Sequence, residues 1–281
     1  MAYRGGVHKK PNPIATLIGA LFVLLFFSFP YLLMVISSLK TREEITKIPP
    51  EYFPAAPQFD NYLKVWSSQV DPGNSLLATT VISFGATLLV LLIATPAAYY
   101  VARFKFRGRM VFLFLVLITQ MLQPTVLAVG LYQEFSQWRG YLVWVALILI
   151  NGAFNLSFAV WIMQSFFASV PKEIDEAALL DGLTRVQTLF KVSLPLVWPG
   201  IVTAIVFVFV NTWNEFAAAF ILVQDSSLQP LTVSMPRFLG MYIRDWQLLF
   251  TVATVAIVPV VILFALIEKR LIGGLTAGAV K

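Results

Sequence analysis

The feature that most constrains this chain is a set of six long apolar stretches that carry almost no charge. A helix needs about 20 mostly apolar residues to cross a lipid bilayer, and each stretch reaches that length. Only Glu215 brings a charge into one of them. The pattern predicts an all-α, polytopic membrane protein, a single transmembrane domain over residues 1–281. The six transmembrane helices are expected at 14–39, 75–102, 110–131, 141–167, 198–223 and 248–267.

The composition excludes a water-soluble protein. Hydrophobic residues make up 59% of the chain and charged residues only 12%, whereas a soluble domain carries about 25% charged residues. The 281 residues include no cysteine and a single histidine, His8. A disulfide framework, a thiolate or histidine metal site and a Ser-His-Asp triad are therefore excluded.

Lysine and arginine predict which helix ends face the cytoplasm. With the N-terminus inside, thirteen of the 20 Lys and Arg residues fall in inner segments and seven in outer ones. The densest basic cluster, Arg103–Arg109, then lies inside, as the positive-inside rule requires. We therefore expect an N-in/C-in topology with an uncleaved first span. The proline-rich segment Lys40–Asn74 and the segment Gln224–Trp246 become outer loops, and no long basic run indicates a nucleic-acid partner.

The inner loop 171–199 carries the most informative local sequence. Pro171 suits the start of a helix, and acidic residues follow it in the first turn, where the helix dipole favours them. Gly182 suits the left-handed position that ends a helix. The pattern predicts a short helix over residues 172–181.

A second short helix is predicted to follow. Thr184 and Gln187 match a capping box, and Leu194-Pro195 marks its end. A helix pair of this kind can rest on the bilayer, bind DNA or dock in a protein groove. The first two roles need helices rich in Lys and Arg, whereas this first helix is acidic. We therefore favour docking in a protein groove, with a membrane-surface connector as the alternative.

The loop also resembles the EAA motif of ABC importer permeases. Glu176-Ala177-Ala178, Asp181-Gly182 and the distal Leu194-Pro195 stand at that motif's spacing. With its flanking residues the loop is similar to the carbohydrate-uptake branch, and in particular to the maltose-type inner-membrane subunit with six helices. The flanking residues are Pro171, Phe190, Leu196 and Pro199.

The resemblance extends over nearly the whole chain. Residues 97–104 are similar to the end of the family's second helix, and residues 213–216 and the tail 274–281 also match. Two departures stand out. Asn155-Leu156-Ser157 replaces a Pro-Phe pair, so the resemblance does not carry over a kink in the fourth span. The chain also ends at Lys281, where relatives commonly add a glycine.

The resemblance implies an ABC type I importer fold in which the helix 172–181 is a coupling helix seated in an ATPase cleft. ATP-driven closure of two ATPase copies would move this helix and rock the spans between inward-open and outward-open states. The chain has no Gly-Lys pair, and so no phosphate-binding Walker A loop. We expect no enzyme activity and no cofactor in this chain, with ATP and Mg²⁺ used by the partner. The coupling residues implied are Glu176, Ala177, Ala178, Asp181, Gly182, Leu194 and Pro195.

The resemblance also implies the other partners and the cargo. The partners are a homologous second permease, an ATPase dimer, an extracytoplasmic solute-binding protein and membrane lipid. The expected location is the cytoplasmic membrane of a bacterium or archaeon, and the expected cargo is a carbohydrate, a di- or oligosaccharide.

Polar residues inside the spans are candidates for a translocation pathway. Asn151 and Asn155 lie one helical turn apart, and Asn211, Asn214 and Glu215 follow an i, i+3, i+4 pattern. One polar stripe on each helix predicts that both helices face a shared interior. Structural hydrogen bonding between helices is an equally good explanation for any single amide.

Glu215 leaves a second function open. An ionised side chain at the bilayer centre costs about 2.5–3.5 kcal/mol, so Glu215 must be neutral, paired or near water. In an ion- or proton-coupled secondary transporter it would bind the coupling ion. Such transporters commonly contain inverted repeats and pairs of broken helices, and this sequence shows neither. An intramembrane enzyme lacks a catalytic set.

Overall fold

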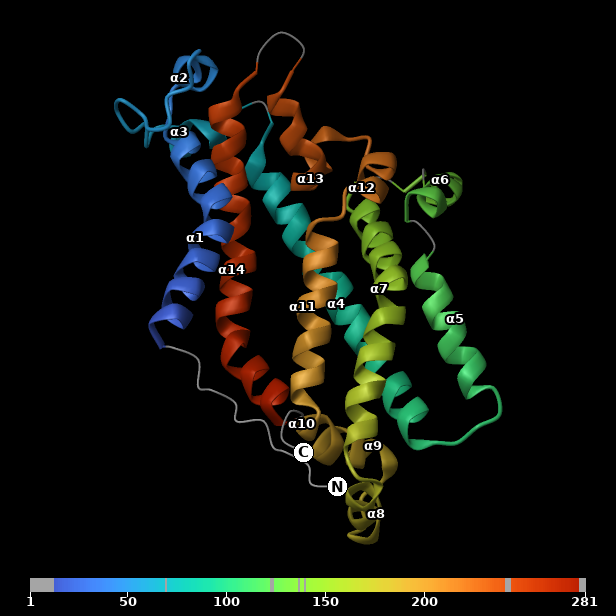
Figure 1. Cartoon of the computed structure of the whole chain (residues 1–281). Coiled ribbons are helices and arrows are strands. Elements are labelled where there is room, and N and C mark those ends of the chain that lie inside the picture. Colours follow the sequence, from blue (N-terminus) through green and yellow to red (C-terminus); the bar gives the residue numbers. More distant parts are fainter. Residues whose placement is uncertain are drawn as a thin grey trace.

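The protein is a bundle of helices, shown in Figure 1. The computed structural model describes residues 13–68, 70–121, 124–135, 137–138, 140–240 and 244–277. Within these ranges, the extended pairing is limited to an isolated bridge between Leu239 and Arg244, so the predicted all-α class is confirmed. The basic N-terminal residues and the last residues of the tail, 278–281, lie outside the described part.

Four helices are long and apolar enough to cross a membrane. They cover the first, second, fourth and sixth predicted spans. The helix over the fourth predicted span continues unbroken through Asn155. The first begins and the last ends at the end of the bundle that carries the loop 171–199 (Figure 1). These helices are α1 (Pro13–Ser38), α4 (Pro72–Arg103), α7 (Leu142–Ser169) and α14 (Trp246–Ala277).

The prediction of one continuous helix over 110–131 is wrong. Two shorter helices replace it, α5 (Arg109–Met121) and α6 (Pro124–Phe135). Pro124 suits the first position of α6, where its missing N–H leaves no hydrogen bond unmade and its fixed φ fits a helix. The 13 residues of α5 span about 20 Å at 1.5 Å per residue, less than the hydrocarbon core of about 30 Å. A sixth crossing, made by α5 and α6 together, stays a prediction, as does the N-in/C-in orientation.

The prediction of one continuous helix over 198–223 is also wrong. The chain forms α11 (Trp198–Trp213) and α12 (Ala217–Leu222), separated by a break around Glu215. At its other end, α11 is bent by 82° from the helical segment Arg185–Leu196. This bent pair is a fifth candidate membrane span.

Small residues let the central helices of the bundle approach closely. α4 shares its most extensive contact with α7, and α11 packs against both. Ala94 of α4 and Ala159 of α7 are fully buried in this core. A Cβ atom on Gly85 of α4 would lie 2.6 Å from the Ile148 side chain of α7. Without a hydrophobic driving force between helices in lipid, close packing of this kind stabilises the bundle.

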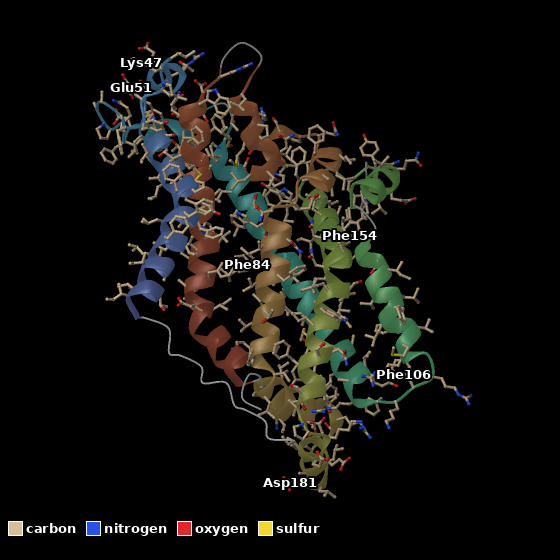
Figure 2. All side chains as sticks on the ribbon, in the orientation of Figure 1. Lys47, Glu51, Phe84, Phe106, Phe154 and Asp181 are labelled. Atoms are coloured by element: carbon tan, nitrogen blue, oxygen red, sulfur yellow. The ribbon has the colours of Figure 1, made fainter. Side chains whose placement is uncertain are left out.

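Short helices cover the end of the bundle opposite the loop 171–199. The segment after α1 folds into a small cap, whose surface carries an ion pair between Lys47 and Glu51 (Figure 2). The segment between α12 and α14 supplies the rest of the cover. The short helices are α2 (Arg42–Thr46), α3 (Asn61–Lys64), η1 (Val65–Ser67), η3 (Ser226–Leu228), α13 (Leu231–Ser234) and η4 (Met235–Phe238).

The segment after α12 is anchored to the long helices by buried hydrogen bonds. The Leu231 amide donates to the Thr79 hydroxyl of α4 at 2.8 Å. The Trp144 indole N–H of α7 donates to the Leu228 carbonyl at 2.9 Å. This outer segment is therefore a packed part of the bundle, and its exposed residues are confined to short stretches such as 224–227.

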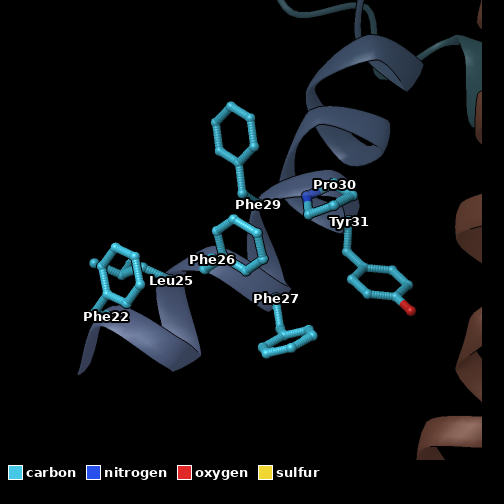
Figure 3. Close-up of a pocket in the computed structure, with 7 residues that line it drawn as sticks. All are labelled: Phe22, Leu25, Phe26, Phe27, Phe29, Pro30 and Tyr31. Atoms are coloured by element: carbon cyan, nitrogen blue, oxygen red, sulfur yellow. The ribbon is translucent and has the colours of Figure 1, made fainter. Parts of the chain in front are cut away.

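Helix α1 leaves most of its apolar surface uncovered. Its side chains from Thr16 to Phe27 are exposed, and it packs against α14. A hollow of about 550 Å³ runs along it, lined by seven residues of α1 alone. Figure 3 shows the rings of Phe22, Phe26, Phe27 and Phe29 standing out from α1, with Pro30 beside Phe29 and Tyr31. This apolar face needs lipid or another membrane protein as its neighbour.

We predict that Gly200→Ala destabilises the bundle. A Cβ atom there would lie 2.7 Å from Cβ of Phe166 and 2.5 Å from Cδ2 of its ring, and overpacking of this kind costs about 1–3 kcal/mol. Gly19→Ala is the control, because nothing lies within 4 Å of that position and alanine favours a helix by about 1 kcal/mol. Thermal unfolding in detergent should show a lower Tm for Gly200→Ala only. An equal Tm for both variants would contradict the packing.

Candidate functional site

A short helix stands at one end of the bundle, where the sequence predicts a docking element. α8 spans Lys172–Leu180, one residue shorter than predicted, and Figure 2 places Asp181 at the tip of this end. Gly182 has φ +88°. Its amide donates to the Leu179 carbonyl and the Leu183 amide donates to Ala178, each at 3.1 Å. This pair of bonds is a Schellman motif, so the predicted glycine stop is confirmed.

A continuous helical segment follows α8 and leads back to the bundle. The predicted capping box is present, since the Thr184 hydroxyl accepts from the Gln187 amide and the Gln187 side chain accepts from the Thr184 amide. The prediction that the second helix ends at Leu194-Pro195 is wrong, because the helical segment continues to Leu196. The helix continues because Pro195 occupies an early position of a new turn, where no N–H is needed. The segment comprises α9 (Arg185–Thr188), a π-helical turn η2 (Leu189–Ser193) and α10 (Leu194–Leu196).

The predicted coupling residues divide between an outer and an inner face. Glu176, Ala177, Asp181, Gly182 and Pro195 are exposed. By contrast, Ala178 is buried against the bundle and Leu194 is half-buried. Beside the exposed set, Leu180 shows 89% of its surface. The outward face of α8 therefore combines carboxylates with an uncovered leucine.

A buried ionic cluster that the sequence does not predict lies beneath α8. The Asp175 carboxylate and the Arg103 guanidinium form an ion pair, with Nε 2.6 Å from Oδ2 and side chains 10% and 6% exposed. The Tyr99 hydroxyl donates to Oδ2 at 3.0 Å and the Ser193 hydroxyl donates to Oδ1 at 2.7 Å. The four side chains join the ends of α4, α8 and η2.

A weak signal for this cluster is present in the sequence. Tyr99 and Arg103 stand four residues apart, so they share one face of α4. The sequence predicts for Asp175, as for its acidic neighbours, only a favourable position at the positive end of the helix dipole. Nothing local distinguishes it from Glu173, because only the fold turns Asp175 inward and leaves Glu173 exposed.

The structure brings the predicted polar stripes of α7 and α11 together. The Asn211 amide donates to Oδ1 of Asn155 at 3.1 Å, and Asn155 itself donates to the Asn151 carbonyl at 2.9 Å. Asn151 and Asn155 are buried, whereas Asn211 is exposed. One turn away, the rings of Phe158 and Phe207 stack with centroids 3.5 Å apart. These helices thus present amides and aromatic rings side by side.

Asn214 and Glu215 lie at the break between α11 and α12. The Glu215 carboxylate accepts from the amides of Ala218 at 2.6 Å and Ala219 at 3.2 Å, and so caps α12. The Thr232 hydroxyl donates to the Glu215 carbonyl at 2.6 Å. Asn214 is exposed and lines a cavity of about 820 Å³ between α1, α11, α13 and α14. Glu215 therefore stabilises a helix break instead of sharing the exposed polar stripe.

These elements define a class of protein. Several apolar helices, a polar stripe between two of them, and a short acidic helix exposed at one end are the parts of a multi-pass membrane permease. Within the described ranges, no three His, Asp or Glu side chains gather as metal ligands.

The chain belongs to the family of binding-protein-dependent transport system inner membrane components, whose model matches residues 92–275. It is thus an ABC transporter permease of the inner membrane, as its resemblance to the EAA-motif permeases indicates.

Curated relatives cover nearly the whole chain. A sulfoquinovosyl glycerol transport system permease of Agrobacterium fabrum is 34% identical over 90% of this chain and 88% of its own. A trehalose/maltose transport system permease of Thermococcus litoralis is 30% identical over 95% of this chain and 96% of its own. A melibiose/raffinose/stachyose import permease of Bacillus subtilis is 30% identical over 97% of this chain and 98% of its own.

A solved structure shares the fold. A chain of a bacterial ABC transporter involved in the import of the acidic polysaccharide alginate superposes with a TM-score of 0.76. The match covers 94% of this chain and 99% of that chain, at 19% identity. The type I importer permease fold that the resemblance implies is therefore present.

We predict that Gly182→Val loosens the end of α8. A β-branched residue in the left-handed region costs about 1–2 kcal/mol, whereas asparagine adopts this region more readily. Hydrogen exchange of the amides from 172 to 183 should speed up in Gly182→Val and change little in the control Gly182→Asn. Equal protection in Gly182→Val and the wild type would contradict the role of the Schellman motif.

Proposed function

We propose that this chain is a translocation subunit of an ATP-driven importer that carries a di- or oligosaccharide across the cytoplasmic membrane of a bacterium or archaeon. The observation that carries the proposal is the exposed outward face of α8, which combines Glu176 and Asp181 with the uncovered Leu180. A helix end with this composition favours a basic, partly apolar groove of another protein. Under this proposal both termini lie inside, on the side of α8.

ATP hydrolysis is assigned to a separate ATPase dimer that seats α8. In this role Glu176, Ala177, Asp181 and Gly182 contact the ATPase, while Ala178 holds α8 against the bundle. Leu194 and Pro195 begin the turn α10, which leads to the bend before α11. ATP and Mg²⁺ are bound by that partner.

A second, homologous permease and an extracytoplasmic solute-binding protein complete the proposed assembly. The uncovered face of α1 and the cavity beside Asn214 are suited to contact with another membrane subunit. The cover of short helices at the opposite end is suited to the binding protein. One of the structural neighbours is a bacterial alginate ABC transporter in complex with an oligosaccharide-bound periplasmic protein, which supports this arrangement.

The proposed sugar passage follows the polar stripe of α7 and α11. Sugars are bound by planar hydrogen-bonding groups and by aromatic faces. Asn155, Asn211 and Asn214 supply amides, and the stacked pair Phe158 and Phe207 supplies an aromatic surface. Asn151 supports the stripe through its backbone carbonyl. The relatives named for trehalose/maltose and for melibiose/raffinose/stachyose support a carbohydrate as the cargo.

Glu215 contributes to this function by capping α12. Both carboxylate oxygens accept backbone amides, which is the pairing that a charged side chain in the membrane requires. No observation therefore favours an ion-coupled transporter that uses Glu215.

We predict that Glu176→Gln lowers sugar uptake by at least about tenfold, because one lost charge-assisted hydrogen bond changes an affinity by about 1.5–3 kcal/mol. Membrane insertion should stay unchanged. The measurement is uptake of labelled trehalose, maltose, melibiose and raffinose by a deletion strain that carries each variant, with copurification of the ATPase. Glu134→Gln is the control, since Glu134 is an exposed glutamate of α6, which lies at the other end of the bundle from α8 and outside the cover of short helices (Figure 1).

Wild-type uptake and normal copurification in Glu176→Gln would refute the docking role of α8. Uptake that persists after ATP depletion in the wild type would refute the importer itself.

We also predict that Glu215→Gln keeps the wild-type pH profile of uptake. Glutamine retains an acceptor oxygen for the α12 amides, whereas Glu215→Ala removes the cap and costs about 0.5–2 kcal/mol of stability. Uptake should be measured between pH 5 and 8 with and without a protonophore. A changed pH profile in Glu215→Gln, or loss of wild-type uptake with the protonophore alone, would favour ion coupling.

A further inference from the structure

Asp175 is the carboxylate that connects α8 to the membrane helices. Its Oδ2 faces Arg103 Nε at 2.6 Å and the Tyr99 hydroxyl at 3.0 Å, both from the last two turns of α4. Its Oδ1 accepts from the Ser193 hydroxyl at 2.7 Å and from Arg103 Nη2 at 3.4 Å. The Arg103 Nε contact is ionic and not aligned as a hydrogen bond. Each oxygen thus has two partners.

Arg103 extends the same cluster to the end of α7. Its Nη1 donates to the carbonyl of Val170, the C-cap residue of α7, at 2.7 Å. Its own carbonyl accepts from the Lys172 ammonium at 3.5 Å, at the start of α8. A single guanidinium therefore holds the end of α4, the end of α7 and the carboxylate of α8 together.

Ser193 reaches this cluster through the π-helical turn. Ser193 is the last residue of η2 and is fully buried. A π-turn inserts one extra residue into a helix and so rotates the side chains that follow it. Directly after it, α10 leads to the 82° bend and then to α11, which carries Asn211 and ends just before Asn214.

α8 touches the bundle through few other side chains. Its buried residues are Asp175 and Ala178, three residues apart on one face. An alanine methyl group slides over a surface at little cost, whereas a buried ion pair separates only at a high cost, since each charge then stays unpaired. The connection that resists separation is therefore the one at Asp175.

We propose that Asp175 is the positioning residue that transmits movement of α8 to the membrane helices, through Arg103 and Tyr99 to α4 and through Ser193 and η2 to α11. This inference rests on the proposed function, in which an ATPase moves α8. It assigns a role to a residue that lies outside the exposed docking face.

The test measures how nucleotide changes the accessibility of the polar stripe. The sequence contains no cysteine, so Asn214→Cys introduces a single reactive site in this chain, at an exposed residue that lines the cavity. The complex with its ATPase partner is treated with a membrane-impermeant methanethiosulfonate reagent, with and without a non-hydrolysable ATP analogue and Mg²⁺. Copurification of the ATPase is measured in parallel for every variant.

In the Asn214→Cys background we expect the analogue to change the labelling rate by about tenfold. A tenfold change corresponds to a free-energy difference of about 1.4 kcal/mol. Adding Asp175→Asn should remove most of this dependence while the ATPase still copurifies. Ser193→Ala, which deletes one hydroxyl, should reduce it partially. Glu173→Gln is the matched control, because it removes an exposed carboxylate of the same helix turn and should leave the dependence unchanged.

The outcomes separate this inference from the proposed function. Full nucleotide dependence in Asp175→Asn would overturn the role of Asp175 and leave the importer standing. If Asp175→Asn fails to assemble, full dependence in Ser193→Ala overturns the path through η2, and reduced dependence supports it. No dependence in the Asn214→Cys background itself would count against the proposed function, and with it against the inference.

Discussion

The structure depends on one constraint, which is that backbone polar groups in a lipid environment must find partners inside the protein. Helices satisfy this along their length, so a helix can end only where another group takes over. Glu215 does so at the start of α12 by accepting two amides, and Arg103 does so at the end of α7 by donating to Val170. These two charged residues thus stand where helices of the bundle begin or end.

Helix α11 gains a particular position from these breaks. It follows an 82° bend at one end and stops before Glu215 at the other, and between them it packs against α4, α7 and α14. Close to the second break, Asn211 of α11 donates to Asn155, which lies near the middle of α7. A helix bounded by two breaks can move as a unit, which is the rigid-element movement that the proposed alternating access requires. The ionic cluster at Asp175 stands next to the turn that leads into it.

Features that depend on near neighbours in the chain could be predicted from the sequence. Hydropathy places α1, α4, α7 and α14 because the length of an apolar stretch is a local property. The glycine stop at Gly182 and the capping box at Thr184 follow from the conformations and hydrogen bonds of adjacent residues. Local spacing also aligned Asn151 with Asn155 and Asn211 with Asn214. Local spacing could not distinguish Glu215 from these asparagines. Glu215 shares their spacing, but its carboxylate turns to cap α12.

The sequence by itself therefore determined the membrane class, the long helices, the acidic helix of the loop 171–199 and its resemblance to a permease family. Tertiary structure alone decided which polar residues meet. Tyr99 and Asp175 are 76 positions apart, and Asn155 and Asn211 are 56 apart, so no local pattern records either contact. It also decided that Asp175 turns inward while Glu176 turns outward. The physical reason is that burial of a carboxylate requires Arg103, Tyr99 and Ser193, and only the packing of α4, α7 and η2 brings those groups to one point.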